Sequence, residues 1–292
     1  MTAQRPVLRA SSAGEPLGAA VLRKSRRLRK IGRRLVLNAL QGGRPQTQVV
    51  FIMGAQRSGT RVPLVALESA PDMLTFREGA RPYFEGVRLT EEAALDRLFE
   101  GCAFPVLVLK PLCESHRARE LLARFPGSRV LWIFRDHHDT IASASLKWRS
   151  GIDAVERIVE GRLRPDDWRG GGLSPELLDV ARRLYQPGLS LHHANAILWF
   201  LRTRLLLDLD LFNCPEALVI KYEDLTSAPA VHFARVFRFL GQRLESGYLN
   251  QIHRNAGRRR PLSGIPPMVA DACEALYGEV DDRYQQSLAK AG

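Results

Sequence analysis

The sequence has few cysteines. Four occur in 292 residues, and they are far apart along the chain: Cys102, Cys113, Cys214 and Cys273. The chain has no C-x-x-C pair, and its seven histidines show no metal-ligand spacing. Adjacent histidines such as His137 and His138 are not expected to face one ligand on a helix. We therefore predict small core thiols that stay reduced, a cytoplasmic location and no bound metal.

Long apolar runs are also absent. The longest, AILWFL from Ala196, is far shorter than a membrane-spanning helix. The N-terminus has no apolar segment of signal-peptide type, so export by that route is not expected. Hydrophobic residues make up 45% and charged residues 25%, which is an ordinary globular balance for one large or two small domains.

Acidic residues are in short supply. The net charge is +12, which favours anionic partners. Residues 21–34 hold eight basic residues and no acid, and HRNAGRRR at 253–260 is a second cluster. We interpret residues 1–40 as a basic tail and helix that packs on the domain or on an anionic membrane surface. A solvated arm is the simpler alternative. Arginine outnumbers lysine, which hints at a GC-rich bacterial genome.

Four apolar runs predict buried strands. They are VVFIM (49–53), VLVLK (106–110), VLWIF (130–134) and ALVIKY (217–222), and none alternates cleanly. Helical patterns lie between them at 62–68, 91–99, 115–125 and 139–148. This alternation predicts an α/β fold of three layers, with a central parallel sheet flanked by helices and ligands at the carboxyl ends of the strands.

One domain is expected over residues 41–292. Residues 149–195 interrupt the strand–helix rhythm with RPDDWRGGGLSPE, and we interpret them as an insertion on the substrate side. A plain surface loop is the alternative. A helix with apolar residues at helical spacing follows in LHHANAILWFLRTRLLLDL.

A phosphate-binding loop without its lysine follows the first strand. GAQRSGTR (54–61) has the glycine spacing of a Walker loop, but Thr60 stands at the lysine position and Arg61 at the Ser/Thr position. Its backbone N–H groups can still bind an anion, and Arg57 can add a charge-assisted hydrogen bond. Ser58 and Thr60 add hydroxyl donors. A glycine turn without a ligand is the plainer alternative.

Further polar residues come at strand ends. Arg135 follows the third run, and Ser143 lies on the next helix, so the two can grip one phosphate; an ion pair of Arg135 with Asp136 or Asp139 is the alternative. Asp139 or Thr140 can cap that helix. Lys110 ends the second run, with a solvated role as its alternative.

Two weaker candidates follow. Glu78 comes after the first crossover, where it can act as a base or pair with Arg77 or Arg81. Tyr222 can stack on a base, while Glu223 and Asp224 brace the following helix.

In this order, the segments resemble the sulfotransferases that use 3′-phosphoadenosine-5′-phosphosulfate. GAQRSGTR resembles their 5′-phosphosulfate loop, with Gln56 where proline is common. FRDHHDTIAS is similar to their 3′-phosphate motif, and VIKYEDLTSAPAVHFARVFRFLG to their Y-E-D-L…F-L-G segment. GRRRPLSG (257–264) is a weaker match. Lys110 followed by Pro111, together with Glu78, resembles the bacterial and tyrosylprotein branch.

The resemblance implies in-line transfer of a sulfuryl group from that donor to an acceptor hydroxyl or amine, without metal. Glu78 would be the base, with Lys110 and Arg57 stabilising the charge. It implies that the donor is held by Gly54, Gln56, Arg57, Ser58, Gly59, Thr60, Arg61, Arg135, Ser143, Tyr222, Arg258, Arg259 and Arg260. The acceptor, a carbohydrate, lipid, phenol or peptide, is left open.

Two other functions were weighed. A P-loop nucleotide kinase would need the missing lysine and Mg²⁺-binding hydroxyl. A basic protein that binds nucleic acid or a membrane surface would work through residues 21–34, with nucleic acid the less expected partner.

Overall fold

The computed structural model describes residues 17–40, 46–164, 167–252 and 261–291, with the backbone alone for 17–27 and 291. The chain divides into two units, Met1–Pro45 and Gln46–Gly292, each described by itself. In the first unit, α1 (Leu17–Leu40) forms where a helix was predicted, and Leu28, Leu35, Val36 and Leu40 on it are exposed. The expected domain boundary after residue 40 stays a prediction. None of the described helices has the length and apolar character needed to cross a membrane.

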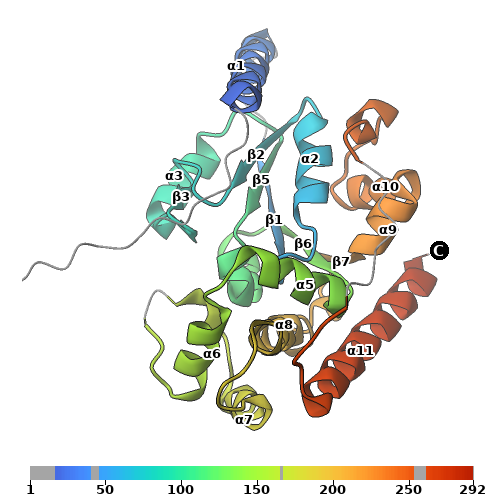
Figure 1. Ribbon diagram of the computed structural model, residues 1–292. Coiled ribbons are helices and arrows are strands. Elements are labelled where there is room, and N and C mark those ends of the chain that lie inside the picture. Colours follow the sequence, from blue (N-terminus) through green and yellow to red (C-terminus); the bar gives the residue numbers. More distant parts are fainter. Residues whose placement is uncertain (1–16, 41–45, 165–166, 253–260, 292) are drawn as a thin grey trace, which may run out of the picture. The chain divides into compact units, whose positions relative to one another are not determined.

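The second unit is built on a parallel five-stranded sheet (Figure 1). Its strands are β1 (Gln48–Gly54), β2 (Met73–Arg77), β5 (Val106–Lys110), β6 (Arg129–Phe134) and β7 (Ala217–Lys221), in the order β2-β5-β1-β6-β7. Four of them are the predicted strands. The fifth, β2, was missed because Thr75 and Arg77 break its apolar run, and as an edge strand it is buried less completely.

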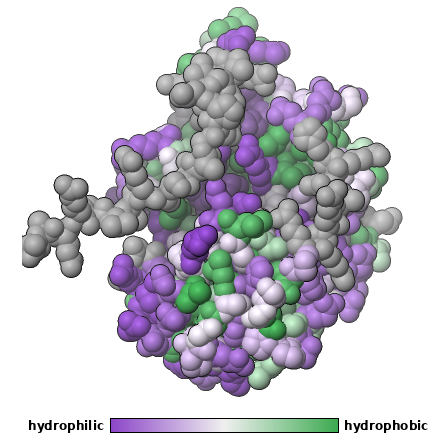
Figure 2. Space-filling model, viewed as in Figure 1, coloured by the Kyte–Doolittle hydropathy of each residue, from purple (hydrophilic) through white to green (hydrophobic). Residues whose placement is uncertain are grey.

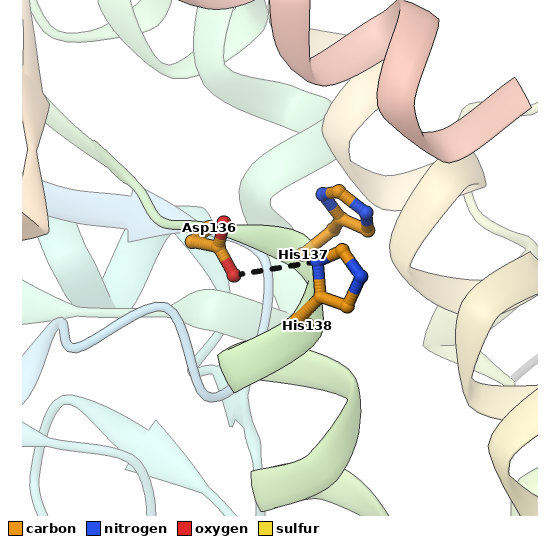
Figure 3. Close-up of side chains that lie close together, drawn as sticks. All are labelled: Asp136, His137 and His138. Atoms are coloured by element: carbon orange, nitrogen blue, oxygen red, sulfur yellow. Dashed lines mark ion pairs between the residues drawn. The ribbon is translucent and has the colours of Figure 1, made fainter. Parts of the chain in front are cut away.

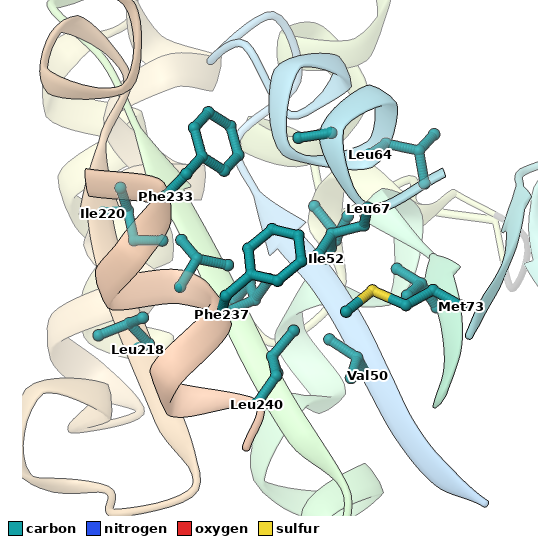
Figure 4. Close-up of a cluster of buried hydrophobic side chains, with 14 of the residues drawn as sticks. Val50, Ile52, Leu64, Leu67, Met73, Leu218, Ile220, Phe233, Phe237 and Leu240 are labelled. Atoms are coloured by element: carbon teal, nitrogen blue, oxygen red, sulfur yellow. The ribbon is translucent and has the colours of Figure 1, made fainter. Parts of the chain in front are cut away.

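Helices cover both faces of the sheet, which confirms the predicted three-layer α/β fold. Helices α2 (Arg61–Ser69), α9 (Tyr222–Ser227) and α10 (Pro229–Phe239) bury one face in a core that includes Ile52 and Phe237 (Figure 4). On the other face lie α4 (Ala118–Arg124), α8 (Leu191–Asp208) and α11 (Pro267–Ala291), with α5 (His137–Lys147) packed on α8. Burial on both faces explains why the strands do not alternate apolar and polar residues.

The connections differ from the prediction in detail. The expected helix at 115–125 is a 3₁₀ turn, η1 (Leu112–Arg117), followed by α4. A small antiparallel hairpin, β3 (Phe84–Glu85) and β4 (Arg88–Leu89), precedes α3 (Glu92–Glu100). It was not predicted, because strands of two residues are too short to leave a pattern in the sequence. The 3₁₀ turns η3 (Leu211–Asn213) and η4 (Ser246–Leu249) and the long α11 were also not predicted.

The segment at 149–195 is not a plain loop. It contains α6 (Gly151–Val159), η2 (Trp168–Gly170) and α7 (Pro175–Leu184), and both helices pack against α8. Ser174 and Ser190 cap α7 and α8 through their hydroxyl groups, which explains why helices follow directly after a Gly- and Pro-rich stretch. A substrate-side role for the segment stays a prediction.

The surface is mixed in character. On the face shown in Figure 2, hydrophilic residues predominate and hydrophobic residues gather in small groups. Such a distribution is ordinary for a globular protein.

Candidate functional site

The loop between β1 and α2 is held in a conformation that glycine makes accessible. Gly54 and Gly59 have φ angles of 136° and 87°. A Cβ on Gly54 would lie 2.3 Å from the carbonyl oxygen of Ile133, and one on Gly59 would lie 2.0 Å from Cδ2 of Tyr222. Both glycines therefore stand where the loop touches neighbouring elements, and a side chain fits at neither position.

The hydroxyl groups of the loop are buried. Ser58 donates from Oγ to the carbonyl oxygen of Ala55 at 2.6 Å, and Thr60 is 5% exposed. Ser58 would have to break this bond to donate to a ligand. Gln56 donates from Nε2 to the carbonyl oxygen of Leu112 at 3.3 Å, so this side chain ties the loop to η1.

Arg57 is the residue of the loop that brings charge to the site. It adopts a left-handed φ of 70°, and its Nε donates to Oγ of Ser143 at 3.0 Å. Burial, and then the charge of Arg135, lower the pKa of Arg57. The structure therefore brings together Arg57 of the loop, Arg135 after β6 and Ser143 of α5, and two neighbouring guanidinium groups favour an anion between them.

Arg135, directly after β6, also forms one of the ion pairs that the sequence left open as an alternative. Its Nη2 pairs with Oδ2 of Asp139 at 2.9 Å, and its guanidinium lies 4.4 Å from the ring centroid of Tyr222. The cap of α5 was predicted at Asp139 or Thr140, and this was wrong. Asp136 is the cap, because its carboxylate accepts a hydrogen bond from the backbone N–H of Asp139.

Tyr222 is 8% exposed at the start of α9 and fills the space between Gly59 and Arg135. The two acids after it brace other elements, as expected. Glu223 accepts from the backbone N–H of Asp136 at 3.2 Å, and Asp224 accepts from Tyr284 Oη at 2.7 Å. An adenine contact for Tyr222 stays a prediction.

Glu78 and Lys110 form an ion pair at the ends of adjacent strands. Nζ of Lys110 lies 3.3 Å from Oε2 of Glu78, and the backbone N–H of Cys113 donates to Oε1 at 3.2 Å. The cause is the register of β2 on β5, which sets Arg77 opposite Lys110 and leaves Glu78 next in line. Glu78 therefore pairs with Lys110, a partner that the alternatives from the sequence, Arg77 and Arg81, did not include.

A pocket beside the loop was not found from the sequence. It lies between α5, α6, η2 and α8 and meets the loop at Ala55 and Gln56. Its wall includes three tryptophans, Trp148, Trp168 and Trp199, and two arginines, Arg169 and Arg202. The sequence offers one signal for this pocket, an arginine within the apolar run that forms α8. From sequence alone this arginine is assigned to the exposed face of an amphipathic helix, because the elements that cover α8 are not known.

His116 lies near this pocket and gives a pH prediction. Burial, and then the charge of Arg202, lower its pKa to about 4 from an ordinary value of 6.5. The contribution of neutral His116 to the free energy of unfolding is therefore complete above about pH 6.5. It is lost as the pH falls toward about 4, because the unfolded chain binds the proton at a higher pH than the folded protein does. We expect His116→Gln to reduce the loss of unfolding free energy between about pH 7 and about pH 4.5, measured by urea denaturation. An unchanged loss would contradict this account.

No protein-family model matches the chain, and no curated protein matches it in sequence. Solved structures do match. A sulfotransferase from Alicyclobacillus acidocaldarius is 17% identical, with 82% of this chain and 94% of that chain covered and a TM-score of 0.44. One from Mycobacterium avium is 13% identical, covers 94% and 87%, and has a TM-score of 0.46. A mouse sulfotransferase in complex with PAP is 15% identical, covers 80% and 84%, and has a TM-score of 0.43.

The chain is similar in structure to solved sulfotransferases. At these low identities and TM-scores the likeness transfers no residue role and no activity to this chain. The fold is established by the sheet itself, and the chemistry depends on the site residues.

A second cluster stands at the start of α5 (Figure 3). The adjacent histidines His137 and His138 were not expected to share a ligand, yet their ring centroids are 4.1 Å apart, and ligand atoms of Asp136, His137 and His138 lie within 4.8 Å of one another. The carboxylate of Asp136 already caps the helix and lies 3.8 Å from Nδ1 of His138. These bonds account for the cluster as a helix start. The expectation of no bound metal stays a prediction.

Four predicted site residues remain. Arg61 is exposed as the first residue of α2. Arg258, Arg259 and Arg260 lie outside the residues that the structure describes.

Proposed function

We propose that this protein is a sulfotransferase that moves a sulfuryl group from 3′-phosphoadenosine-5′-phosphosulfate to a hydroxyl group, or an amine, of an acceptor. The observation that carries the proposal is the Glu78–Lys110 pair, 3.3 Å apart at the carboxyl ends of β2 and β5, in the same sheet edge as a phosphate loop that contains Arg57. A carboxylate, an ammonium and a guanidinium at one edge provide a base and two cations for a charged leaving group.

The donor would be held from both sides of β1. The backbone of Gly54–Thr60 and the start of α2 offer N–H groups to the 5′-phosphosulfate. Arg135 and Ser143 supply charge and a hydroxyl group on the other side, where the 3′-phosphate is expected, and Arg57 lies between the two groups because its Nε donates to Ser143 Oγ. Arg135 reaches this position while paired with Asp139, so a phosphate would compete with that carboxylate.

In the transfer step, the acceptor oxygen forms a bond to sulfur as the bond between sulfur and the leaving 5′-phosphate oxygen breaks. Glu78 takes the acceptor proton. Its carboxylate is oriented for this by Cys113 N–H and Lys110, because each binds a different carboxylate oxygen. Lys110 and Arg57 stabilise the charge that develops on the sulfuryl oxygens and the leaving phosphate, so positioning and preorganised charge supply the catalysis.

The nucleotide kinase is not favoured. The residue at its lysine position, Thr60, is buried, and the residue at its metal-binding hydroxyl position is the exposed Arg61. Binding of nucleic acid or a membrane through residues 21–34, the cytoplasmic location and the acceptor class remain predictions.

Thermal unfolding with nucleotide tests the donor site. At about 100 times the Kd, 3′-phosphoadenosine-5′-phosphate should raise the Tm by about 5–10 °C, because ligand that binds the native state alone adds about 2.7 kcal/mol. Adenosine 5′-phosphate, which lacks the 3′-phosphate, should give a smaller shift at the same concentration. Arg57→Gln should reduce the first shift strongly, while the control Arg183→Gln, an exposed position on α7, should not.

The absence of any Tm shift with millimolar 3′-phosphoadenosine-5′-phosphate would count against the proposed donor. A shift of equal size with both nucleotides would remove Arg135 and Ser143 from the 3′-phosphate site.

A further inference from the structure

The guanidinium of Arg202 is buried, and two of its three nitrogens have no hydrogen-bond partner among the described residues. Arg202 is 2% exposed on α8 and lines the tryptophan pocket. Its Nη1 donates to the carbonyl oxygens of Trp168 and Gly171, both at 3.2 Å. Its Nε and Nη2 have no hydrogen-bond partner within the described part of the chain. Nε and Nη2 form the side of the guanidinium that binds two oxygens of one oxyanion.

Among the described residues, no ion pair joins this cation to a carboxylate. Glu114, an acidic neighbour, accepts from Arg88 at Oε1 (3.2 Å) and from Arg117 at Oε2 (3.0 Å), so both of its oxygens are in use. The other charged neighbours, Arg88 and Arg169, are cations, and Cys113 is a neutral thiol whose pKa burial raises. A buried, unpaired charge is costly, and burial accordingly lowers the pKa of Arg202 to about 10.

The place of Arg202 connects it to the proposed chemistry. Its pocket reaches Ala55 and Gln56 of the loop on one side. Gln56 also donates to the carbonyl oxygen of Leu112 at 3.3 Å, and the backbone N–H of the next residue, Cys113, holds the carboxylate of Glu78 at 3.2 Å. The pocket that contains Arg202 is therefore connected to the base through η1, with Trp148, Trp168 and Trp199 as apolar walls around the rest of a bound molecule.

We propose that Nε and Nη2 of Arg202 bind an oxyanion of the acceptor, so that the acceptor is an aromatic or apolar hydroxy compound that also carries a carboxylate or a phosphate. The role of this anion as part of an acceptor rests on the proposed function. The anion site itself rests only on the pocket and its buried arginine, and it can be tested without turnover.

Binding of three matched probes to the wild-type protein is the first test. Phenylpropanoate, phenethyl phosphate and the neutral phenylpropanol are titrated by calorimetry, with and without 3′-phosphoadenosine-5′-phosphate. We expect one or both anions to bind about 10- to 100-fold more tightly than the alcohol, the factor that charge-assisted hydrogen bonds supply. Carboxylate and phosphate are distinguished by which of them binds more tightly. Equal affinity for the alcohol, or no binding of either anion, would overturn the proposal.

Variants locate the site. Arg202→Gln should remove the preference for the anion, and Arg202→Lys should lose most of it, because lysine keeps the charge without the two-pronged geometry. Arg183→Gln is the control, an exposed arginine whose loss should leave the preference intact. Circular dichroism checks that the variants fold, since Nη1 also binds carbonyl oxygens of η2 and of the residue after it. A folded Arg202→Gln protein that still prefers the anion would refute the assignment.

The two proposals fail separately. If the nucleotide causes no Tm shift but phenylpropanoate or phenethyl phosphate still binds through Arg202, the anion site stands and the sulfotransferase proposal falls. If the nucleotide binds through Arg57 and both anions bind no better than the alcohol, the donor site stands and the acceptor does not use Arg202.

Discussion

Glu78→Gln should lower the rate of sulfuryl transfer by about 10²- to 10⁴-fold, the range that a positioned general base supplies. Glutamine is close in shape to glutamate and its amide oxygen can still accept from Cys113 N–H, so the substitution removes the base and the charge opposite Lys110 with little change of packing. Turnover is measured with labelled donor once an acceptor is found by screening sugars, phenols, lipids and peptides.

Two comparisons make this result specific to Glu78. The Tm shift caused by 3′-phosphoadenosine-5′-phosphate should survive in Glu78→Gln, because the contacts proposed for the donor lie on the loop, at Arg135 and on α5. Glu85→Gln, at an exposed glutamate of the neighbouring hairpin, should keep full activity. If Glu78→Gln retains wild-type turnover, the base is another residue and Glu78 merely neutralises Lys110.

Gly59→Ala should destabilise the protein by about 2–5 kcal/mol and abolish nucleotide binding. A left-handed φ costs a residue with a side chain about 1–2 kcal/mol, and overpacking adds about 1–3 kcal/mol. Both terms apply here, because Gly59 has a φ of 87° and its Cβ would lie 2.0 Å from the ring of Tyr222. Urea denaturation measures the first effect and calorimetric titration with nucleotide the second.

The two terms can be separated with a matched glycine. Gly188 has a similar φ of 72° and nothing within 4 Å of its added Cβ, so Gly188→Ala should show the backbone cost alone. Gly59→Ala should cost less unfolding free energy when it is introduced into Tyr222→Ala than when it is introduced into the wild-type protein, and the difference is the overpacking part. Equal destabilisation by the two glycine variants would show that Tyr222 moves aside easily and does not press on the loop.

These two positions also show where prediction from sequence stopped. The glycine loop was predicted because its glycines and Arg57 follow an unmistakable buried strand. Glu78 was a weak candidate base from its place after the first crossover and matched the resemblance, whereas its contact with Lys110 depends on β2, a strand that its own sequence does not reveal. A side chain on an unrecognised edge strand has no assigned neighbours until the register is known.

The sequence by itself determined the fold class, the order of four of the five sheet strands along the chain and the position of the glycine loop after β1, because buried parallel strands and glycine turns leave local patterns. Only the tertiary structure decided which charges pair. It joined Glu78 to Lys110, set Arg57 beside Arg135 and Ser143, and left two nitrogens of Arg202 at a tryptophan pocket without a hydrogen-bond partner among the described residues. Pairing depends on strand register and helix packing between residues far apart in the chain, and no local pattern records either.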